Sequence, residues 1–164
     1  MSETAPETVT PEPCPDPTDP RCGPVGKICC PIQFPPKPAG CLCVDEVRDN
    51  NDAPATILEA KYDFNIYGRI VVTAGNALTG KATVTIYADQ LGGPFDEAIG
   101  SVEVDITGDD TFNWTVTVAG GTLPDAPAGG SNLYHLAAVM SMVNSYGVST
   151  ETSAFVDLGL YRIS

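Results

Sequence analysis

Apolar and polar residues alternate with a period of two along residues 55–164, and no segment in this range shows a sustained helical period. Because successive side chains of a strand point to opposite faces, this alternation predicts strands with one buried face. The expected strands lie at residues 55–60, 63–73, 82–88, 101–107, 111–118, 132–143 and 153–163. The pattern therefore predicts an all-β domain of six or seven strands.

One side of each predicted strand is apolar and is expected to face a core. The inward residues are Phe64, Ile66, Ile70 and Val72; Ala82, Val84, Ile86 and Ala88; Val102, Val104 and Ile106; and Phe112, Trp114, Val116 and Val118. Connections rich in Gly, Asp and Pro separate the strands, and the sequence GDD at 108–110 is typical of a hairpin turn. Short strands at this spacing favour two packed antiparallel sheets, which is a β-sandwich.

The segment GGSNLYHLAA, at residues 129–138, resembles the approach to the penultimate strand of an immunoglobulin-like or fibronectin-type sandwich. In this resemblance Tyr134 stands at the tyrosine-corner position, and Leu136 stands where an antibody domain carries a cysteine. The resemblance covers residues 55–164 at the level of the pattern and implies an immunoglobulin-like sandwich. A shared fold of this kind does not by itself imply a function.

Residues 1–54 differ in composition, because they hold 12 of the 15 prolines. Proline fixes φ and lacks a backbone donor, so we expect extended chain here, with neither a helix nor a central strand. We therefore expect an extended, cross-linked arm at 1–54 and a sandwich domain at 55–164 that alone buries a core. The polar stretch VRDNNDAPA, at 47–55, is the expected hinge between them. The arm's expected apolar anchors are Ile28, Ile32, Phe34 and Leu42.

All six cysteines lie in this arm: Cys14, Cys22, Cys29, Cys30, Cys41 and Cys43. Such density is typical of small oxidised scaffolds, so disulfides are the favoured interpretation. Zinc held by thiols in a reducing cytosol is the alternative. The sequence does not choose among the possible pairings, although the neighbours Cys29 and Cys30 are expected to have different partners because disulfide geometry is strict.

The net charge of −13, without a basic patch, disfavours binding to nucleic acid. Insertion into a membrane is not expected, because the apolar stretches are shorter than the ~20 residues that cross a bilayer. The first residues, MSETAPETVTPEP, lack the basic start and apolar run of a secretory signal. We therefore expect an extracellular or particle-associated protein without a classical signal, with the cytoplasm as the alternative.

Candidate catalytic groups are few. The single histidine, His135, shares its parity with Ala137 and Val139, which favours a partly buried position or a sheet interface over catalysis. Acidic pairs could support a carboxylate-dependent hydrolase, but solvated surface is the simpler interpretation; the pairs are Asp96 and Glu97, Glu103 and Asp105, and Asp109 and Asp110. A calcium site is conceivable at three loop acids, Asp109, Asp110 and Asp125.

Together these features favour a non-enzymatic structural or interaction protein without a cofactor. We expect a sandwich subunit of a larger assembly, of decoration, cap or fibre type, whose arm contacts a neighbouring subunit, because an extended arm buries much area per residue. The first alternative is a carbohydrate- or receptor-binding module that uses the loops at one end of the sandwich. Surface tyrosines could contribute to such binding: Tyr67, Tyr87, Tyr146 and Tyr161. A small carboxylate-dependent hydrolase is the second alternative.

Overall fold

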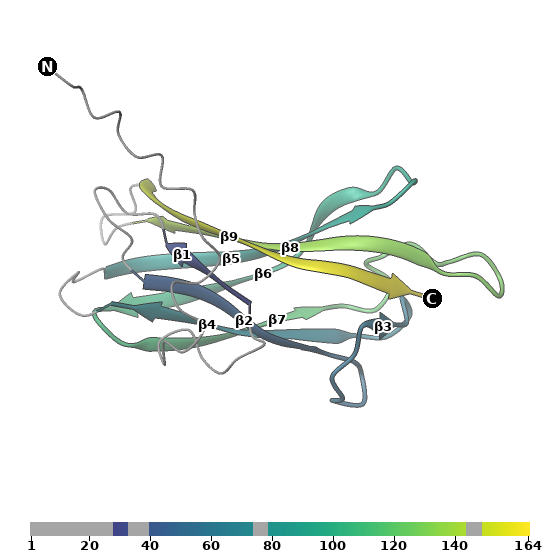
Figure 1. Cartoon of the computed structure of the whole chain (residues 1–164), viewed down its shortest axis with the longest axis horizontal. Helices are drawn as coiled ribbons and strands as arrows, with labels where there is room; N and C mark the ends of the chain where they lie inside the picture. Colours follow the sequence, from purple (N-terminus) through teal and green to yellow (C-terminus); the bar gives the residue numbers. More distant parts are fainter. Residues whose placement is uncertain (1–27, 33–39, 74–78, 144–148) are drawn as a thin grey trace, which may run out of the picture.

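The structure is a computed structural model that describes residues 28–32, 40–73, 79–143 and 149–164, with only the backbone described at 28–32 and 149–152. The described residues form nine strands in two sheets, without a helix (Figure 1). The sheets form two layers, and their inner faces supply one shared core. The predicted all-β sandwich is thus confirmed. No helix that could span a membrane is present among these residues.

One sheet has four strands and the other has five. The four-stranded sheet has the order β1-β2-β4-β7, with β1 at Ile28–Ile32, β2 at Gly40–Arg48, β4 at Phe64–Val72 and β7 at Thr111–Val118. The five-stranded sheet has the order β3-β9-β8-β5-β6, with β3 at Ile57–Leu58, β9 at Ser149–Ile163, β8 at Asn132–Val143, β5 at Thr79–Gln90 and β6 at Asp96–Thr107. All neighbours pair antiparallel except β3, which runs parallel to β9.

The core follows the alternation that the sequence predicts. Every expected inward residue of β4 and β5 is buried, and so are Val104, Ile106, Trp114, Val116 and Val118. Val102 and Phe112 are partly buried and pack against the same cluster. The longest inward run lies on β8, where alternate residues from Tyr134 to Met142 are buried between the sheets.

The expectation that no central strand precedes residue 55 is wrong for β2, which lies between β1 and β4. Leu42, Val44 and Val47 on this strand belong to the main core, so residues 55–164 do not build the core alone. A β-bulge between Val44 and Glu46 shifts the alternation by one residue, which brings Val47 to the inner face despite its odd number. The prolines flank β2 without interrupting it. The division of the chain at residue 54 stays a prediction.

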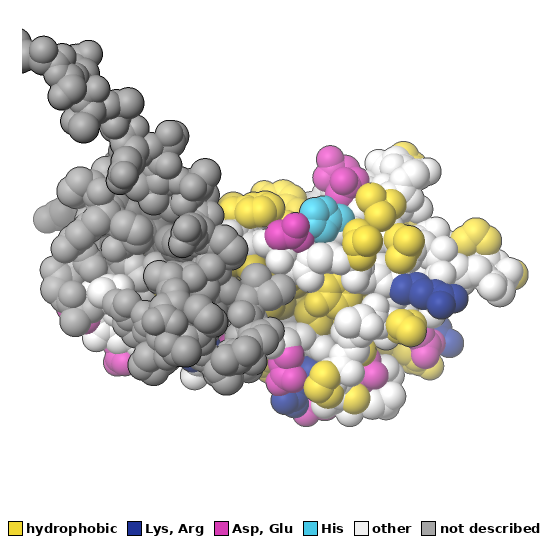
Figure 2. Space-filling model, in the orientation of Figure 1, with side chains coloured by type: hydrophobic (Ala, Val, Ile, Leu, Met, Phe, Trp, Pro, Cys, Tyr) yellow, Lys and Arg dark blue, Asp and Glu magenta, His cyan; other side chains and the backbone are white. Residues whose placement is uncertain are grey.

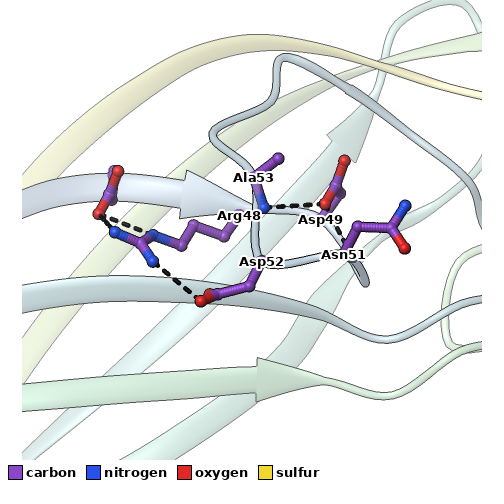
Figure 3. A network of polar contacts seen from close by, with 6 residues as sticks. Arg48, Asp49, Asn51, Asp52 and Ala53 are labelled. Atoms are coloured by element: carbon purple, nitrogen blue, oxygen red, sulfur yellow. Dashed lines mark hydrogen bonds and ion pairs between the residues drawn. The ribbon is translucent and has the colours of Figure 1, made fainter.

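The expected hinge after β2 is a closed turn. The Asp49 carboxylate accepts hydrogen bonds from the amides of Asn51 and Ala53, at 2.9 and 3.1 Å (Figure 3). Arg48 bonds Glu46 and also pairs with Asp52 at 3.1 Å, and these two carboxylates raise the pKa of its guanidinium above the ordinary value. Asp52 has φ of 59°, a conformation that aspartate tolerates in turns. These contacts hold the turn in one shape.

Trp114 of β7 stands directly opposite Gly68 of β4, and its indole occupies the space that a side chain at position 68 would need. Trp114 itself is buried in the main core. A glycine at this place in the strand therefore allows the largest side chain of the core to lie flat on the neighbouring backbone. The contact fixes the register of β4 against β7.

We predict that Gly68→Ala destabilises the fold by about 2 kcal/mol or more, since an added Cβ overpacks the core. That atom would lie 2.1 Å from Trp114 Cζ2 and 2.3 Å from the Cys43 carbonyl oxygen. Urea unfolding followed by tryptophan fluorescence measures the change. Gly130→Ala is the control, because its Cβ would meet nothing closer than the Pro127 oxygen at 3.3 Å. Equal stability of the two variants would contradict the role given to Trp114.

Candidate functional site

Several large apolar side chains are exposed on the outer face of the five-stranded sheet, around β8 and β9. Leu133 on β8 and Phe155 and Leu160 on β9 are 45, 55 and 56% exposed. Tyr87 on β5 is also exposed and pairs in register with Ala137 on the same face. We call Tyr87, Leu133, Phe155 and Leu160, together with His135 and Asp157 between them, the outer patch. Large exposed apolar patches are uncommon on monomeric proteins and mark surfaces that bind something.

The centre of the outer patch is a polar contact between His135 on β8 and Asp157 on β9. His135 Nε2 lies 2.5 Å from an oxygen of Asp157, and the same oxygen accepts the Gly159 amide at 2.8 Å. Partial burial alone would raise the pKa of Asp157, but the hydrogen bonds from His135 and Gly159 together outweigh it and lower that pKa below its ordinary value. Figure 2 shows the single histidine in cyan with yellow apolar side chains on both sides.

A β-bulge builds this pair. In the β8–β9 ladder His135 stands opposite Leu160 and Leu136 opposite Gly159, but Ala137 stands opposite Asp157. The extra residue on β9 lets Asp157 and Leu160 share the outer face although their numbers differ in parity. Gly159 adopts φ of 88° at this step, a conformation that glycine accepts without strain.

Few charges accompany the apolar side chains. Asp89 of β5 stands opposite His135 in register, and Arg162 of β9 stands opposite Leu133. The guanidinium of Arg162 donates to the Ser131 hydroxyl at 2.8 Å. The outer patch and its immediate neighbours thus carry two acids and one arginine besides the histidine, in a chain whose net charge is −13, while Lys81, Glu103 and Asp105 lie farther along the same sheet.

A second candidate site lies at the end of the sandwich where the β5–β6 hairpin and the β7–β8 connection project, the same end as the C-terminus (Figure 1). It is an open groove of about 510 Å³. One part of its lining is apolar and the other can form hydrogen bonds; the two sets are Pro94, Phe95, Pro124 and Pro127, and Gln90, Glu97, Asp125 and Asn132. We call this the loop-end groove.

Two aromatic rings support the loop-end groove. Phe95 meets Tyr134 edge to face, with ring centroids 6.0 Å apart. Tyr134 is fully buried, and burial raises the pKa of its phenol, an effect that the nearby Asn132 side chain partly offsets. Apart from the nearby Asn132 side chain, its buried hydroxyl has no hydrogen-bond partner within the part of the chain that the structure describes. Tyr134 therefore lacks the hydrogen bond to backbone that defines a tyrosine corner.

The three acids of the expected calcium site are not brought together. Asp109 and Asp110 lie in the turn between β6 and β7, where the Asp110 carbonyl accepts the Val72 amide at 2.9 Å. Asp125 lines the loop-end groove at the opposite end of β7. Among the described residues there is no group of three or more His, Cys, Asp or Glu that could hold a metal ion.

The expected acidic pairs are mostly surface features. Glu103 and Asp105 are exposed on β6, and Glu103 lies 3.6 Å from Lys81 of the neighbouring strand. Asp96 and Glu97 open β6 and are exposed too, and of the two only Glu97 lines the loop-end groove.

The four tyrosines considered at first do not share one face. Tyr67 lies under the Arg48 guanidinium at 5.3 Å, whereas Tyr87 belongs to the outer patch. Tyr161 packs partly buried against the core, and burial raises its pKa. Tyr146 lies outside the described residues.

The structure describes four of the six cysteines, two of them by their backbone alone. Cys14 and Cys22 lie outside the described residues, and Cys29 and Cys30 are placed by their backbone on β1. Cys41 and Cys43 are buried on the outer side of β2, where they form a small cluster with Val71 that is separate from the main core. Leu42 between them is part of the main core, so it anchors its own sandwich and not an extended arm.

Sequence reasoning found His135 but missed the outer patch around it. A signal was present, since Leu133 and Leu136 have opposite parity on one predicted strand, and Phe155 and Leu160 have opposite parity on another. In regular alternation one leucine of the first pair and one residue of the second must face outward. Comparison of the chain with known protein-family models and with curated proteins found no match.

We predict that the stability of the protein falls as the pH drops below about 4, in part because Asp157 becomes protonated. Its pKa is lower in the folded protein than in the unfolded chain, so the unfolded chain binds the proton more readily. The contribution is complete above the ordinary pKa and is lost as the pH falls through the lowered one. Urea unfolding from pH 7 to pH ~2.5 should show that the free energy of unfolding depends less on pH in Asp157→Asn than in the unchanged protein. Glu103→Gln is the control, because it removes a charge elsewhere on the sheet. Identical profiles for Asp157→Asn and the unchanged protein would refute this assignment.

Proposed function

We propose that this protein is a non-enzymatic structural or interaction protein, the β-sandwich subunit of a larger assembly. The observation that carries the proposal is the outer patch, an exposed apolar surface on an otherwise acidic molecule. Burial of apolar surface between subunits is the main favourable term in association. A flat sheet face of this kind suits contact with another folded surface.

The sandwich is proposed to be of the immunoglobulin-like or fibronectin type. The order β2-β4-β7 corresponds to strands A, B and E of such a domain, and the order β9-β8-β5-β6 corresponds to G, F, C and C′. Tyr134 near the start of β8 then takes the place of a tyrosine on strand F. This correspondence supports the fold assignment and leaves the function to be argued from the surfaces.

The occupant of the outer patch is proposed to be a neighbouring subunit, in the simplest case a second copy of this chain. Two copies that each carry −13 repel one another over most orientations. The outer patch carries less of this charge, because Arg162 offsets one of the two acids, Asp89 and Asp157, and the other side chains of the patch are apolar apart from His135. In a two-fold contact the Arg162 of one copy can approach the Asp89 of the other, so the same patch serves both sides.

The proline-rich segment before β1 is proposed to reach a neighbouring subunit as well. Because β2 contributes to the core, an experiment on this segment has to stop before β1. A deletion up to residue 44 would remove half of β2 and unfold the sandwich.

We predict that Phe155→Ser combined with Leu160→Ser reduces self-association of the full chain by at least tenfold in dissociation constant, since about 1.4 kcal/mol of lost apolar burial suffices for that factor. Analytical ultracentrifugation over a concentration series measures the constant. Tyr62→Ser is the matched control, because Tyr62 is exposed in the loop before β4, away from the outer patch. A double variant that sediments as the unchanged protein does would exclude the outer patch as the contact.

The loop-end groove favours a second candidate function, a module that binds a neutral carbohydrate. Its amide and carboxylate side chains can accept and donate hydrogen bonds to sugar hydroxyls, and Phe95 with the prolines offers an apolar wall. Glu97 and Asp125 would repel anionic sugars. The groove lies on loops that a rigid sandwich positions, which is the usual place for a binding site.

If the loop-end groove binds a neutral carbohydrate, the unchanged protein should bind at least one neutral glycan on a glycan array. Asp125→Ala combined with Asn132→Ala should then abolish that binding. Leu160→Ser in the outer patch is the control and should leave such binding intact. Absence of binding across the array for the unchanged protein would eliminate the carbohydrate hypothesis while leaving the assembly hypothesis untouched.

A further inference from the structure

Cys29 and Cys43 occupy directly opposite positions in the antiparallel pair of β1 and β2. The Cα atoms of directly opposite residues in an antiparallel pair are about 4.5 or 5.5 Å apart. Both spacings lie within the range of Cα separations, about 4.4–6.8 Å, that a disulfide can bridge. The backbone register thus satisfies the main geometric condition for a bond between these two residues.

The other pairings among residues of β1 and β2 satisfy this condition less well. Cys30 stands opposite Leu42, whose side chain is in the main core, and Cys41 stands opposite Pro31. A diagonal bond from Cys29 to Cys41 would have to span about 7–8 Å between Cα atoms, which is too far. The ladder therefore favours Cys29 with Cys43.

The surroundings of Cys43 suit a buried cross-link. Cys43 is a free thiol in this structure; it is fully buried and lies with Cys41 and Val71 on the outer side of the sheet, apart from the main core. It stands beside Arg69 in the β2–β4 ladder, and that arginine is engaged with Asp45 at 3.2 Å. A disulfide is apolar and accepts such burial at little cost, whereas an edge strand such as β1 gains from being fastened.

We propose that, on oxidation of the thiol state seen in this structure, Cys29 and Cys43 form a cross-strand disulfide that fastens β1 to the four-stranded sheet. A small-molecule disulfide such as oxidised glutathione is the oxidant. One cysteine thiolate attacks it and releases one reduced thiol, and the second cysteine attacks the resulting mixed disulfide and releases the other. Two protein thiols thus become one disulfide, and one small disulfide becomes two thiols. The bond ties the segment that precedes β1 to the sandwich at a fixed point.

Peptide mapping of the full chain tests the pairing. The protein, refolded with a mixture of reduced and oxidised glutathione, is denatured, treated with iodoacetamide and digested with trypsin without reduction. Trypsin separates Cys14 in peptide 1–21 and Cys22 in peptide 22–27 from the peptide 28–48, because Lys37 precedes proline and resists cleavage. Tandem mass spectrometry of peptide 28–48 is expected to show no fragments from cleavage between residues 29 and 43 until the peptide is reduced.

Each alternative gives a distinct spectrum that overturns the proposal. An alkylated Cys43 means a free thiol, and a cross-linked pair of tryptic peptides means a partner at Cys14 or Cys22. Fragments from cleavage between residues 29 and 30 before reduction mean that Cys30 closes the loop instead. None of these outcomes requires a variant to fold.

Stability measurements with matched variants supply a second readout. A bond that closes a loop of this length is expected to favour folding by about a hundredfold in the equilibrium constant, so a reductant should lower the urea midpoint of the unchanged protein. Cys30→Ala should respond to the reductant in the same way. Cys29→Ala and Cys43→Ala should no longer respond, and a reductant effect that persists in Cys29→Ala would contradict the pairing.

Discussion

The core between the two sheets is the constraint on which the other features depend. Each strand can give only one face to it, so every bulge in the ladders decides which residues are left on the outside. Trp114 lying on Gly68 fixes β4 against β7, and the run from Tyr134 to Met142 fills the opposite layer. These inward contacts decide which residues of each strand are left on the two outer faces.

The two outer faces then have different chemistry. The outer side of the four-stranded sheet carries polar cross-strand contacts, such as the Thr117 hydroxyl donating to Asn65 at 2.7 Å, and the Arg69–Asp45 ion pair. The outer side of the five-stranded sheet has large apolar side chains around His135 and Asp157 instead. Four large exposed apolar side chains of an acidic protein are thus gathered on the outer side of one sheet.

The N-terminal part of the chain joins the sandwich earlier than its composition indicates. The closed turn around Asp49 leads from β2 toward β3, and its hydrogen bonds lie within the expected hinge at 47–55. The cysteines at 41 and 43 are therefore constituents of a sheet, on the opposite face of β2 from Leu42. A cross-link from Cys43 to Cys29 would stabilise the edge of that sheet by holding β1 against β2.

The sequence by itself determined the all-β class, the inward residues of β4, β5 and β7, and the bounds of β8, because period-two alternation is a local property of each strand. Only the tertiary structure decided that β2 is a central strand, since its bulge breaks the alternation and its cysteines resemble those of a cross-linked arm. The outer patch and the separation of Asp125 from Asp109 and Asp110 were decided in the same way. These features depend on which strands become neighbours and on where bulges fall, and neither is encoded within a single segment.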